Sequence, residues 1–206
     1  MAPKNKFTRE ETVNAALSVV RMRGAEGLTA KSVAEALGVS TRPIFSYFDT
    51  MDALKAQVRL AAEAVWKTYL EAGLGEAVPF FGFGMEYIRF AREEPHLYRL
   101  VFLQAAPDGE SGAVKAMDQV RGMVRPSLER IYGITTEEAD CYFRDMWLVV
   151  HSLATLIVTG GCPYSDEEIG KILTGVSVSV CKALKEIPGF AAGEYDRDAI
   201  FTALIG

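Results

Sequence analysis

The sequence predicts an all-α protein, in which a small N-terminal head of three helices is joined by a long helix to a larger helical bundle. Two observations support this fold class. Apolar residues recur at spacings of three and four along most of the 206 residues, and capping patterns of the form Ser/Thr-x-x-Glu open several of these segments. No segment alternates in the manner of a strand. With half of its residues hydrophobic, the chain can bury a sizeable core.

The first predicted helix begins at a capping box. Thr8 is followed three residues later by Glu11, and Phe7 occupies the position of a hydrophobic staple. Gly24 marks the end of the helix. The apolar stripe between these signals consists of Val13, Ala16, Leu17 and Val20. We expect this helix to pack across the two short helices that follow it.

Residues 28–54 predict two short helices joined by a tight turn, followed by the start of a third. Thr29 is a good N-cap for the first short helix, and Gly38 can end it in the left-handed conformation. Ser40 is a second N-cap, and Pro43 lies in the first turn of the next helix, where a missing N–H costs nothing. This helix–turn–helix unit is the one that places its second helix in a DNA major groove.

The outward side chains of this unit favour DNA binding over a purely structural role. Helix pairs with a glycine corner also occur in many all-α cores, but a merely solvated face would more usually carry Glu and Lys. We expect Thr41, Arg42 and Pro43 to meet base edges, with Arg42 reading guanine. The other expected DNA-contacting residues are Thr29, Lys31, Ser40, Ser46, Tyr47 and Lys55.

The same stretch closely resembles the helix-turn-helix of TetR/AcrR-type bacterial transcriptional regulators. The matching residues are Thr29, Ala34, Leu37, Gly38, Val39, Ser40, Phe45, Phe48 and Leu54. Two positions depart from the family pattern, because Met51 stands where relatives often have Lys and Phe45 replaces a common Tyr. Both changes remove a phosphate partner, and Lys55 is expected to replace one of them in part.

The charge distribution agrees with a DNA-binding head. Residues 1–60 hold nine Lys and Arg against six Asp and Glu, a net charge of +3. Residues 61–206 hold thirteen against twenty-one, a net charge of −8, which gives −5 for the whole chain. A basic head followed by an acidic remainder is typical of a DNA-binding protein whose second part has a different function.

The remaining helices are predicted from their caps and apolar spacing. A long strut capped by Thr50 or Asp49 runs to Glu71, where Gly73 and Gly75 break it, and about twenty residues span roughly 30 Å. Pro126 should kink or split the helix that contains it. The other expected helices lie at 79–94, 95–102, 113–132, 196–205 and in two long segments that open at Thr135-x-x-Glu138 and Ser165-x-x-Glu168.

The resemblance extends beyond the head. The segments FAREEPHLYRLVF and MWLVVHSLATL look like a TetR C-terminal domain type named for a Trp-His-Gly motif, present here as Trp147, His151 and Ser152. The resemblance implies that residues 1–50 form a DNA-binding domain and residues 51–206 an effector-binding and dimerisation domain. It also implies a four-helix dimer interface built from the helices at about 136–160 and 165–186.

An aromatic pocket is the expected effector site. Phe143, Trp147 and His151 share one helix face, since they are spaced four residues apart. His151 is either a hydrogen-bonded core residue or a polar anchor in an apolar pocket for a small apolar or aromatic effector, and the sequence leaves both open. The further candidate walls of this pocket are Tyr87, Phe90, Tyr98, Phe102, Met117 and Met123.

Enzymatic and metal chemistry is not expected. The chain has two histidines, no metal-binding spacing, no phosphate-cradling glycine loop and no nucleophile elbow, so we expect no metal and no cofactor. Three cysteines without a C-x-x-C spacing fit reduced thiols, and an exposed Cys162 would allow a redox sensor. The N-terminus lacks the apolar region of a signal peptide, and the apolar run Trp147–Thr159 is short, which favours a cytoplasmic, nucleoid-associated protein without a membrane partner.

These observations predict a homodimeric regulator, most often a repressor in the family it resembles. The two recognition helices, Ser40 to Tyr47, would enter successive major grooves of double-stranded DNA, about 34 Å apart on a near-palindromic operator. An effector would change the separation of the heads if it binds the two conformations with different affinity. The alternatives are a ligand-insensitive regulator with a filled core and a redox-sensing regulator that uses Cys162.

Overall fold

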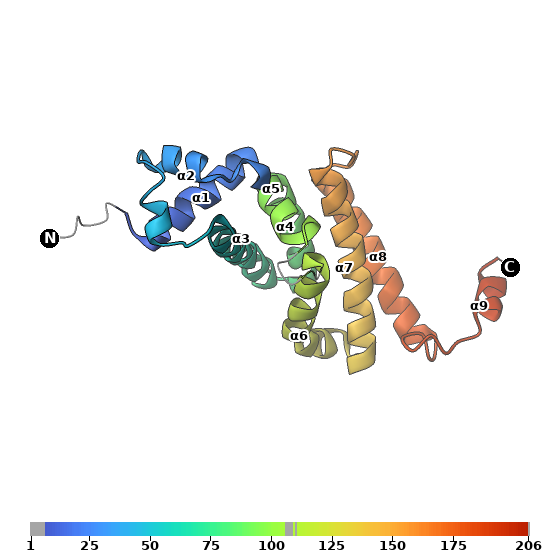
Figure 1. Cartoon of the computed structure of the whole chain (residues 1–206). Helices are drawn as coiled ribbons and strands as arrows, with labels where there is room; N and C mark the ends of the chain where they lie inside the picture. Colours follow the sequence, from blue (N-terminus) through green and yellow to red (C-terminus); the bar gives the residue numbers. More distant parts are fainter. Residues whose placement is uncertain (1–6, 106–108, 110, 206) are drawn as a thin grey trace. The chain divides into compact units, whose positions relative to one another are not determined.

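The computed structural model describes residues 7–105, 109 and 111–205, and it confirms the all-α prediction (Figure 1). Within these residues the β-type pairing is limited to one isolated bridge, between Ala105 and Ser111. The α-helices are α1 (Arg9–Arg23), α2 (Ala30–Leu37), α3 (Met51–Leu74), α4 (Pro79–Glu93), α5 (Pro95–Tyr98), α6 (Gly112–Tyr132), α7 (Thr136–Val158), α8 (Asp166–Glu186) and α9 (Arg197–Ile205). The 3₁₀-helices are η1 (Ala25–Gly27) and η2 (Ile44–Ser46), and η3 (Arg99–Leu103) is a π-helix.

The chain divides into two compact units. The first comprises Met1–Lys115 together with Ala154–Cys162, and the second comprises Ala116–Leu153 together with Pro163–Gly206. Two of the three divisions fall inside α6 and α7, so these two helices belong to both units, and the third lies between α7 and α8. This division concerns compactness alone, and the expected functional boundary after residue 50 stays a prediction.

The caps of the first unit are those that the sequence predicts. The Thr8 hydroxyl accepts from the Glu11 N–H at 3.0 Å, and the Thr8 N–H donates to the Glu11 carboxylate at 2.7 Å. Thr50, rather than Asp49, caps α3, because its hydroxyl accepts from the Ala53 N–H at 3.1 Å. Such caps each stabilise a helix by about 1 kcal/mol.

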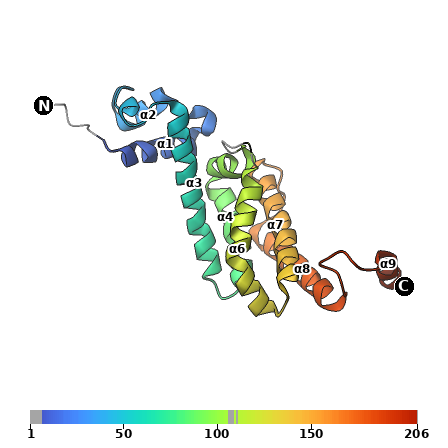
Figure 2. The same ribbon diagram turned by 60° about the horizontal axis from the view of Figure 1, so that its bottom comes forward.

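In the first unit α3 lies alongside α4 (Figure 2). Glycines make this close approach possible. A Cβ atom on Gly73 would lie 2.6 Å from the Phe83 backbone, and one on Gly82 would lie 2.4 Å from the Gly73 carbonyl oxygen. The helix α3 runs to Leu74, so Gly73 does not break it as expected but lets the next helix pack against its last turn.

The second unit is held together by side chains that link α6, α7 and α8. The Arg125 guanidinium donates to the Asp140 carboxylate at 2.7 and 2.9 Å, which joins α6 to α7. The hydroxyls of Tyr142 and Ser177 are 2.8 Å apart and join α7 to α8.

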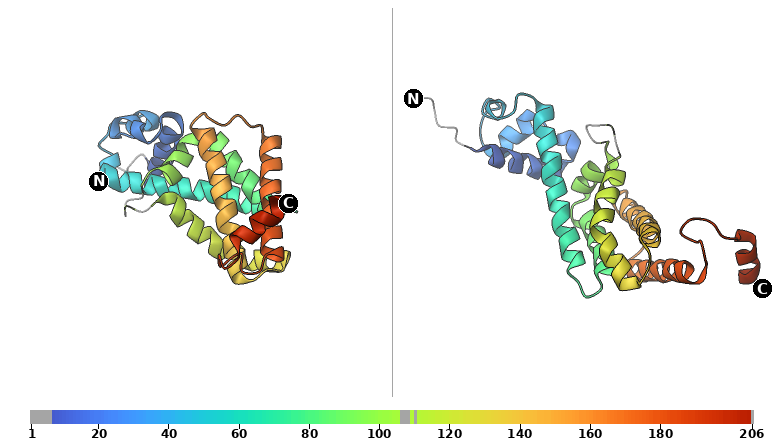
Figure 3. Two further views of the ribbon diagram at one scale, coloured as in Figure 1. Left: turned by 90° about the vertical axis from the view of Figure 1, so that its right-hand side faces the viewer. Right: turned by 90° about the horizontal axis from the view of Figure 1, so that it is seen from below.

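Pro126 lies inside α6 without splitting it. The expected cap at Ser165 is present, and a short segment stacked through Phe190 and Tyr195 leads to α9 (Figure 3).

The helix α7 begins at Thr136, well before the apolar run that starts at Trp147. By length and composition alone its 23 residues could cross a membrane, and 44% of its most apolar window is buried within the structure. Core helices of soluble proteins meet the same criteria, so one such helix is weak evidence for a membrane span. Asp140 of this helix pairs with Arg125 of α6 at 2.7 Å.

Candidate DNA interface and ligand-binding regions

The helix α2 is fixed at its start by two hydroxyls. The Thr29 hydroxyl accepts from the Ser32 N–H at 3.1 Å, and the Ser32 hydroxyl accepts from the Thr29 N–H at 2.9 Å. Ser32 is buried, and its hydroxyl also lies 2.7 Å from the Gly27 carbonyl oxygen. The predicted cap at Thr29 is therefore confirmed, and its hydroxyl is already engaged within the head. Gly38 ends α2 with a φ of 66°, the left-handed conformation that the sequence predicts.

The recognition segment is not the regular α-helix that the sequence predicts over residues 40–47. The chain turns through residues 41–43 and then forms the single 3₁₀ turn of η2. Its hydrogen bonds span three residues, from the Ile44 N–H to the Thr41 carbonyl at 3.1 Å and from the Ser46 N–H to the Pro43 carbonyl at 3.2 Å. Pro43 explains the difference, because it lacks an N–H and disfavours the α conformation at Arg42.

The side chains expected to meet DNA are nevertheless presented to solvent. Thr41 and Arg42 are exposed and Pro43 is half-buried, so the three expected base readers stand together at the turn before η2. Ile44 and Phe48 are buried beneath them and anchor the segment in the head. The further exposed residues of the expected interface are Thr29, Lys31, Ser40, Ser46 and Lys55, and Tyr47 is half-buried.

Three features of this surface were not expected from the sequence. The Tyr47 hydroxyl donates to the Phe7 carbonyl oxygen at 2.6 Å, which ties the end of the recognition segment to the start of the head. The Arg9 guanidinium lies over the Phe48 ring at 4.9 Å. Phe45 is 46% exposed, so an aromatic ring stands beside the polar residues of the expected interface. A pattern of apolar spacing cannot separate Phe45 from its buried neighbours.

The candidate effector residues of the first unit form a buried ring cluster. Tyr87, Phe90, Tyr98 and Phe102 are each at most 3% exposed. Ring centroids are 5.2 Å apart for Tyr87 and Phe102 and 5.0 Å apart for Tyr98 and Phe102. Trp66 of α3 is not among the expected pocket residues, but it joins the cluster, with its ring centroid 5.4 Å from that of Phe102. These rings fill the core of the unit, and their expected role as pocket walls stays a prediction.

Tyr98 carries the polar end of this cluster. Its hydroxyl is 3.0 Å from that of Thr155 on α7. Burial raises the pKa of Tyr98 to about 12, although the hydrogen bond with Thr155 acts in the opposite direction. Tyr98 therefore stays protonated at neutral pH and offers a hydroxyl, not a charge, to its surroundings.

In the second unit the structure brings Phe143 and Trp147 together, with ring centroids 5.8 Å apart. His151, one turn further along α7, is half-buried, and burial lowers its pKa. Of the two candidate methionines, Met117 is half-buried and Met123 is 59% exposed. The ring contact of Phe143 and Trp147 agrees with a shared face on α7. The role of His151 and any contact with an effector stay predictions.

The three cysteines differ in their burial. Cys141 is buried beside Asp145, and burial raises the pKa of its thiol. Burial also raises the pKa of Cys181. Cys162 is half-buried. In the described part of the chain no group of three His, Cys, Asp or Glu side chains could hold a metal ion.

A cleft that the sequence does not indicate lies within the first unit. Its volume is about 310 Å³, and its walls come from the end of α1 with η1, from the first half of α3, and from η3 with the residues after it. Lys55, one of the expected DNA contacts, stands in its wall and pairs with Asp52 at 3.2 Å. Spatial neighbours from three separate segments create the cleft, which leaves no local signal in the sequence.

Two segments of the chain match known protein families. Residues 13–58 match the family described as bacterial regulatory proteins, tetR family. Residues 80–174 match the one described as tetracyclin repressor-like, C-terminal domain. Together the segments cover more than half of the chain. No curated protein matches the chain in sequence. The Trp-His-Gly subtype stays a prediction.

Solved structures share the fold at low sequence identity. A TetR-like transcriptional regulator from Rhodococcus sp. RHA1 has a TM-score of 0.64 at 14% identity, covering 86% of this chain and 95% of its own. The multidrug binding protein EbrR complexed with malachite green has a TM-score of 0.60 at 18% identity, covering 82% and 96%. A TetR variant from Acinetobacter baumannii AYE in complex with minocycline has a TM-score of 0.52 at 15% identity, covering 87% and 97%.

Proposed function

Since this chain belongs to the TetR family of bacterial regulatory proteins, we propose that it is a ligand-responsive repressor that binds a near-palindromic operator as a homodimer. The observation that carries the proposal is the turn of the head at which Thr41 and Arg42 are exposed above the buried anchors Ile44 and Phe48. The family fold is typically non-enzymatic, and we place the protein in the cytoplasm with the nucleoid.

Arg42 is the proposed reader of sequence. Its guanidinium can donate two parallel hydrogen bonds to guanine O6 and N7, and a pair of this kind contributes roughly 1–3 kcal/mol of discrimination. Lys31 and Lys55 are exposed cations on the same head, and we assign them to phosphates, where they would strengthen binding without reading sequence. Thr29 and Tyr47 support the segment through the hydrogen bonds of their hydroxyls inside the head.

The proposed dimer uses α7 and α8. Leu148 of α7 is 55% exposed and Val178 of α8 is 54% exposed, so each helix presents a large apolar side chain to solvent. Burying such side chains against a second copy would remove apolar surface from water. The helices expected from the sequence at about 136–160 and 165–186 agree closely with α7 and α8 as observed.

The proposed effector is a small apolar or aromatic molecule. Complexes of structurally similar proteins with malachite green and with minocycline support this class of ligand. The aromatic residues of α4, η3 and α7 are the candidate contacts, and the effector must bind one head arrangement more tightly than the other to change operator affinity. The close ring packing around Phe102 favours a second candidate, a regulator with a filled core that does not respond to a ligand.

Footprinting of the purified protein on its own upstream DNA, across a series of salt concentrations, tests the proposal. We expect a protected near-palindrome with half-sites about 34 Å apart, and an affinity that falls steeply with salt because phosphate contacts release counterions. Binding that is weak and unlocalised on this DNA would contradict the presence of an operator for this protein in it. Where a footprint is found, a screen of aromatic compounds against it separates the two candidates. A compound that removes the protection indicates a ligand-responsive regulator, and unchanged protection indicates a ligand-insensitive one.

A further inference from the structure

The cleft of the first unit lies between the head and the π-helix. Val20, Ala25 and Leu28 form its wall on the head side, and Ala56, Val58 and Leu100 contribute apolar surface from α3 and η3. At about 310 Å³ its volume is at the lower end of the range of roughly 300–1,000 Å³ that is usual for ligand pockets. Mostly apolar walls with a few polar groups are the usual composition of such pockets.

The charged groups of the cleft favour an anion. Lys55, Arg59 and Asp52 stand in its walls, two cations against one carboxylate. The buried Arg59 guanidinium donates to the carbonyl oxygens of Val101 and Gln104 at 3.0 and 3.1 Å. Its Nε also pairs with the Glu63 carboxylate at 3.5 Å, so the charge of Arg59 is already partly compensated within the unit.

Lys55 is the cation that a ligand can reach. Its Nζ is paired with Asp52 at 3.2 Å, and the two side chains are 53% and 89% exposed. Such solvated pairs on one helix contribute little to stability, so a ligand carboxylate can take the place of Asp52. A ligand held there would keep its charged end at the rim and its apolar body between the head and Leu100.

The π-helix is a second observation at this cleft. π-helical turns are rare and occur frequently at functional sites, because their widened backbone is less stable than an α-helix. In this chain η3 places Leu100 in the cleft wall, and the chain directly after it adds Gln104. Arg59 holds the carbonyl groups at the end of η3 onto α3. An occupant of the cleft would thus contact both the head and the segment that is fastened to α3.

We propose that this cleft is a binding site for a small organic anion with an apolar body, of the arylalkyl carboxylate class. The site is distinct from the aromatic effector region proposed above, and it does not depend on that region. Because its walls come from the head and from η3, occupancy would restrain the head against α3. It would also draw Lys55 away from a DNA phosphate.

Calorimetry on the full chain without DNA tests the site with two probes of nearly equal shape, 4-phenylbutyrate and its neutral amide, 4-phenylbutyramide. We expect one saturable site per chain and about tenfold tighter binding of the carboxylate, as for one charge-assisted hydrogen bond at a partly solvated position. Lys55→Gln should weaken the carboxylate to the level of the amide. Lys67→Gln, at an exposed position further along α3, is the matched control and should change neither probe.

Ala56→Phe would fill the cleft and should abolish the binding of both probes, provided that circular dichroism shows a folded chain. Lys55→Gln alters an exposed residue, so the test stands even if Ala56→Phe fails to fold. Equal affinity for the two probes would overturn the proposal. Loss of binding in His151→Ala but not in Lys55→Gln would overturn it as well, because the probe would then occupy the C-terminal region.

Discussion

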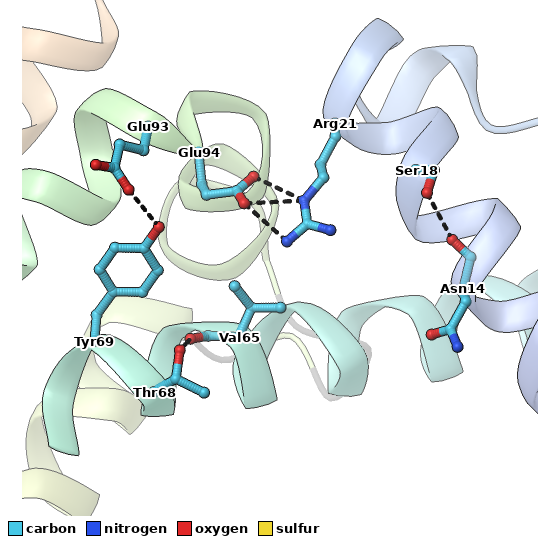
Figure 4. Close-up of polar contacts among 8 residues, drawn as sticks. All are labelled: Asn14, Ser18, Arg21, Val65, Thr68, Tyr69, Glu93 and Glu94. Atoms are coloured by element: carbon cyan, nitrogen blue, oxygen red, sulfur yellow. Dashed lines mark hydrogen bonds and ion pairs between the residues drawn. The ribbon is translucent and has the colours of Figure 1, made fainter. Parts of the chain in front are cut away.

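The guanidinium of Arg21 and the carboxylate of Glu94 form a forked ion pair. The Arg21 Nε lies 2.9 and 3.0 Å from the two oxygens of Glu94, and a terminal nitrogen lies 2.8 Å from one of them (Figure 4). Arg21 belongs to the last turn of α1, and Glu94 separates α4 from α5. Nearby, a Cβ atom on Gly24 would lie 3.2 Å from Nδ1 of His96. The head is therefore fastened to the α4–α5 junction at one end of α1.

Breaking this fork should loosen the head. In a double-mutant cycle with Arg21→Gln and Glu94→Gln we expect a coupling of about 0.5–1 kcal/mol in the free energy of unfolding, since Arg21 is 40% exposed and solvent screens the pair. Urea denaturation measures the coupling. The matched control is the same cycle with Arg23→Gln and Glu35→Gln, because that pair is 3.6 Å long and more than half exposed on both sides. An equal coupling in the control cycle would mean that the fork contributes nothing specific.

Arg42→Ala should remove sequence discrimination from operator binding. We expect a loss of about 1–3 kcal/mol in the preference for the native operator over variants at the contacted base pair. Competition binding with a set of single-base operator variants measures this preference. Lys31→Ala is the control, because losing a phosphate contact should weaken all sequences equally and reduce the salt slope by about 1. An unchanged preference in Arg42→Ala would exclude it as a base reader.

Arg59→Met should destabilise the first unit. The side chain is 7% exposed, and its loss leaves the carbonyl groups of Val101 and Gln104 without their donor. We expect the free energy of unfolding to fall by about 1.5–3 kcal/mol, the usual range for hydrogen bonds to a charged group. Arg89→Met, at a 51% exposed position with ion pairs to Glu86 and Glu93, should cost well below that. Thermal unfolding of both variants measures the two losses of stability and shows whether that of Arg59→Met is the larger.

His151 should make stability dependent on pH. Burial lowers its pKa below the ordinary value of 6.5, so the folded chain holds the imidazole neutral. Above pH 6.5 this contribution is fully present. As the pH falls from 6.5 toward the lower folded pKa, the unfolded chain binds the proton first and stability is lost. Urea midpoints measured between pH 7.5 and about 5 should therefore fall more steeply in the wild type than in His151→Gln. Parallel curves would show that burial does not perturb His151.

His151→Ala should also distinguish the two roles that the sequence leaves open. If His151 anchors an effector, the variant should keep its operator affinity and lose most of its response to a ligand identified in the footprint screen. If His151 is a core residue, only the melting temperature should fall. Fluorescence anisotropy with labelled operator, with and without ligand, gives both readings from one preparation.

Features that depend on neighbours in sequence were predictable. The caps at Thr8, Thr29 and Ser165 are where the sequence places them, because a hydroxyl and an N–H three residues apart meet in any helix start. The starts of α1, α3 and α8 follow from such caps, whereas α3 continues to Leu74, beyond its predicted end at Glu71. The exposed polar set around Arg42 was predictable for the same reason, since burial of Ile44 and Phe48 determines which side chains point outward.

Features that depend on distant neighbours were not predictable. Arg59 is a charged residue on an amphipathic helix, and nothing in its local sequence shows that carbonyl groups more than 40 residues away will surround it. The π-helix η3 and the cleft beside it arise from the same long-range packing. The recognition segment differs from the prediction for a local reason. Pro43 is compatible with the first turn of an α-helix, but a proline also disfavours the α conformation of the residue before it, which here is Arg42.

The 3₁₀ turn at Ile44–Ser46 has a thermodynamic consequence for operator binding. If the major groove requires a regular helix there, residues 41–47 must exchange the backbone hydrogen bonds of the 3₁₀ turn for those of an α-helix on contact. Association would then show a larger negative heat-capacity change than rigid docking of the same surface, together with an enthalpy that offsets the ordering. A head whose segment is already helical would bind the same operator with a smaller unfavourable entropy change. It would also adapt less readily to half-sites of related sequence.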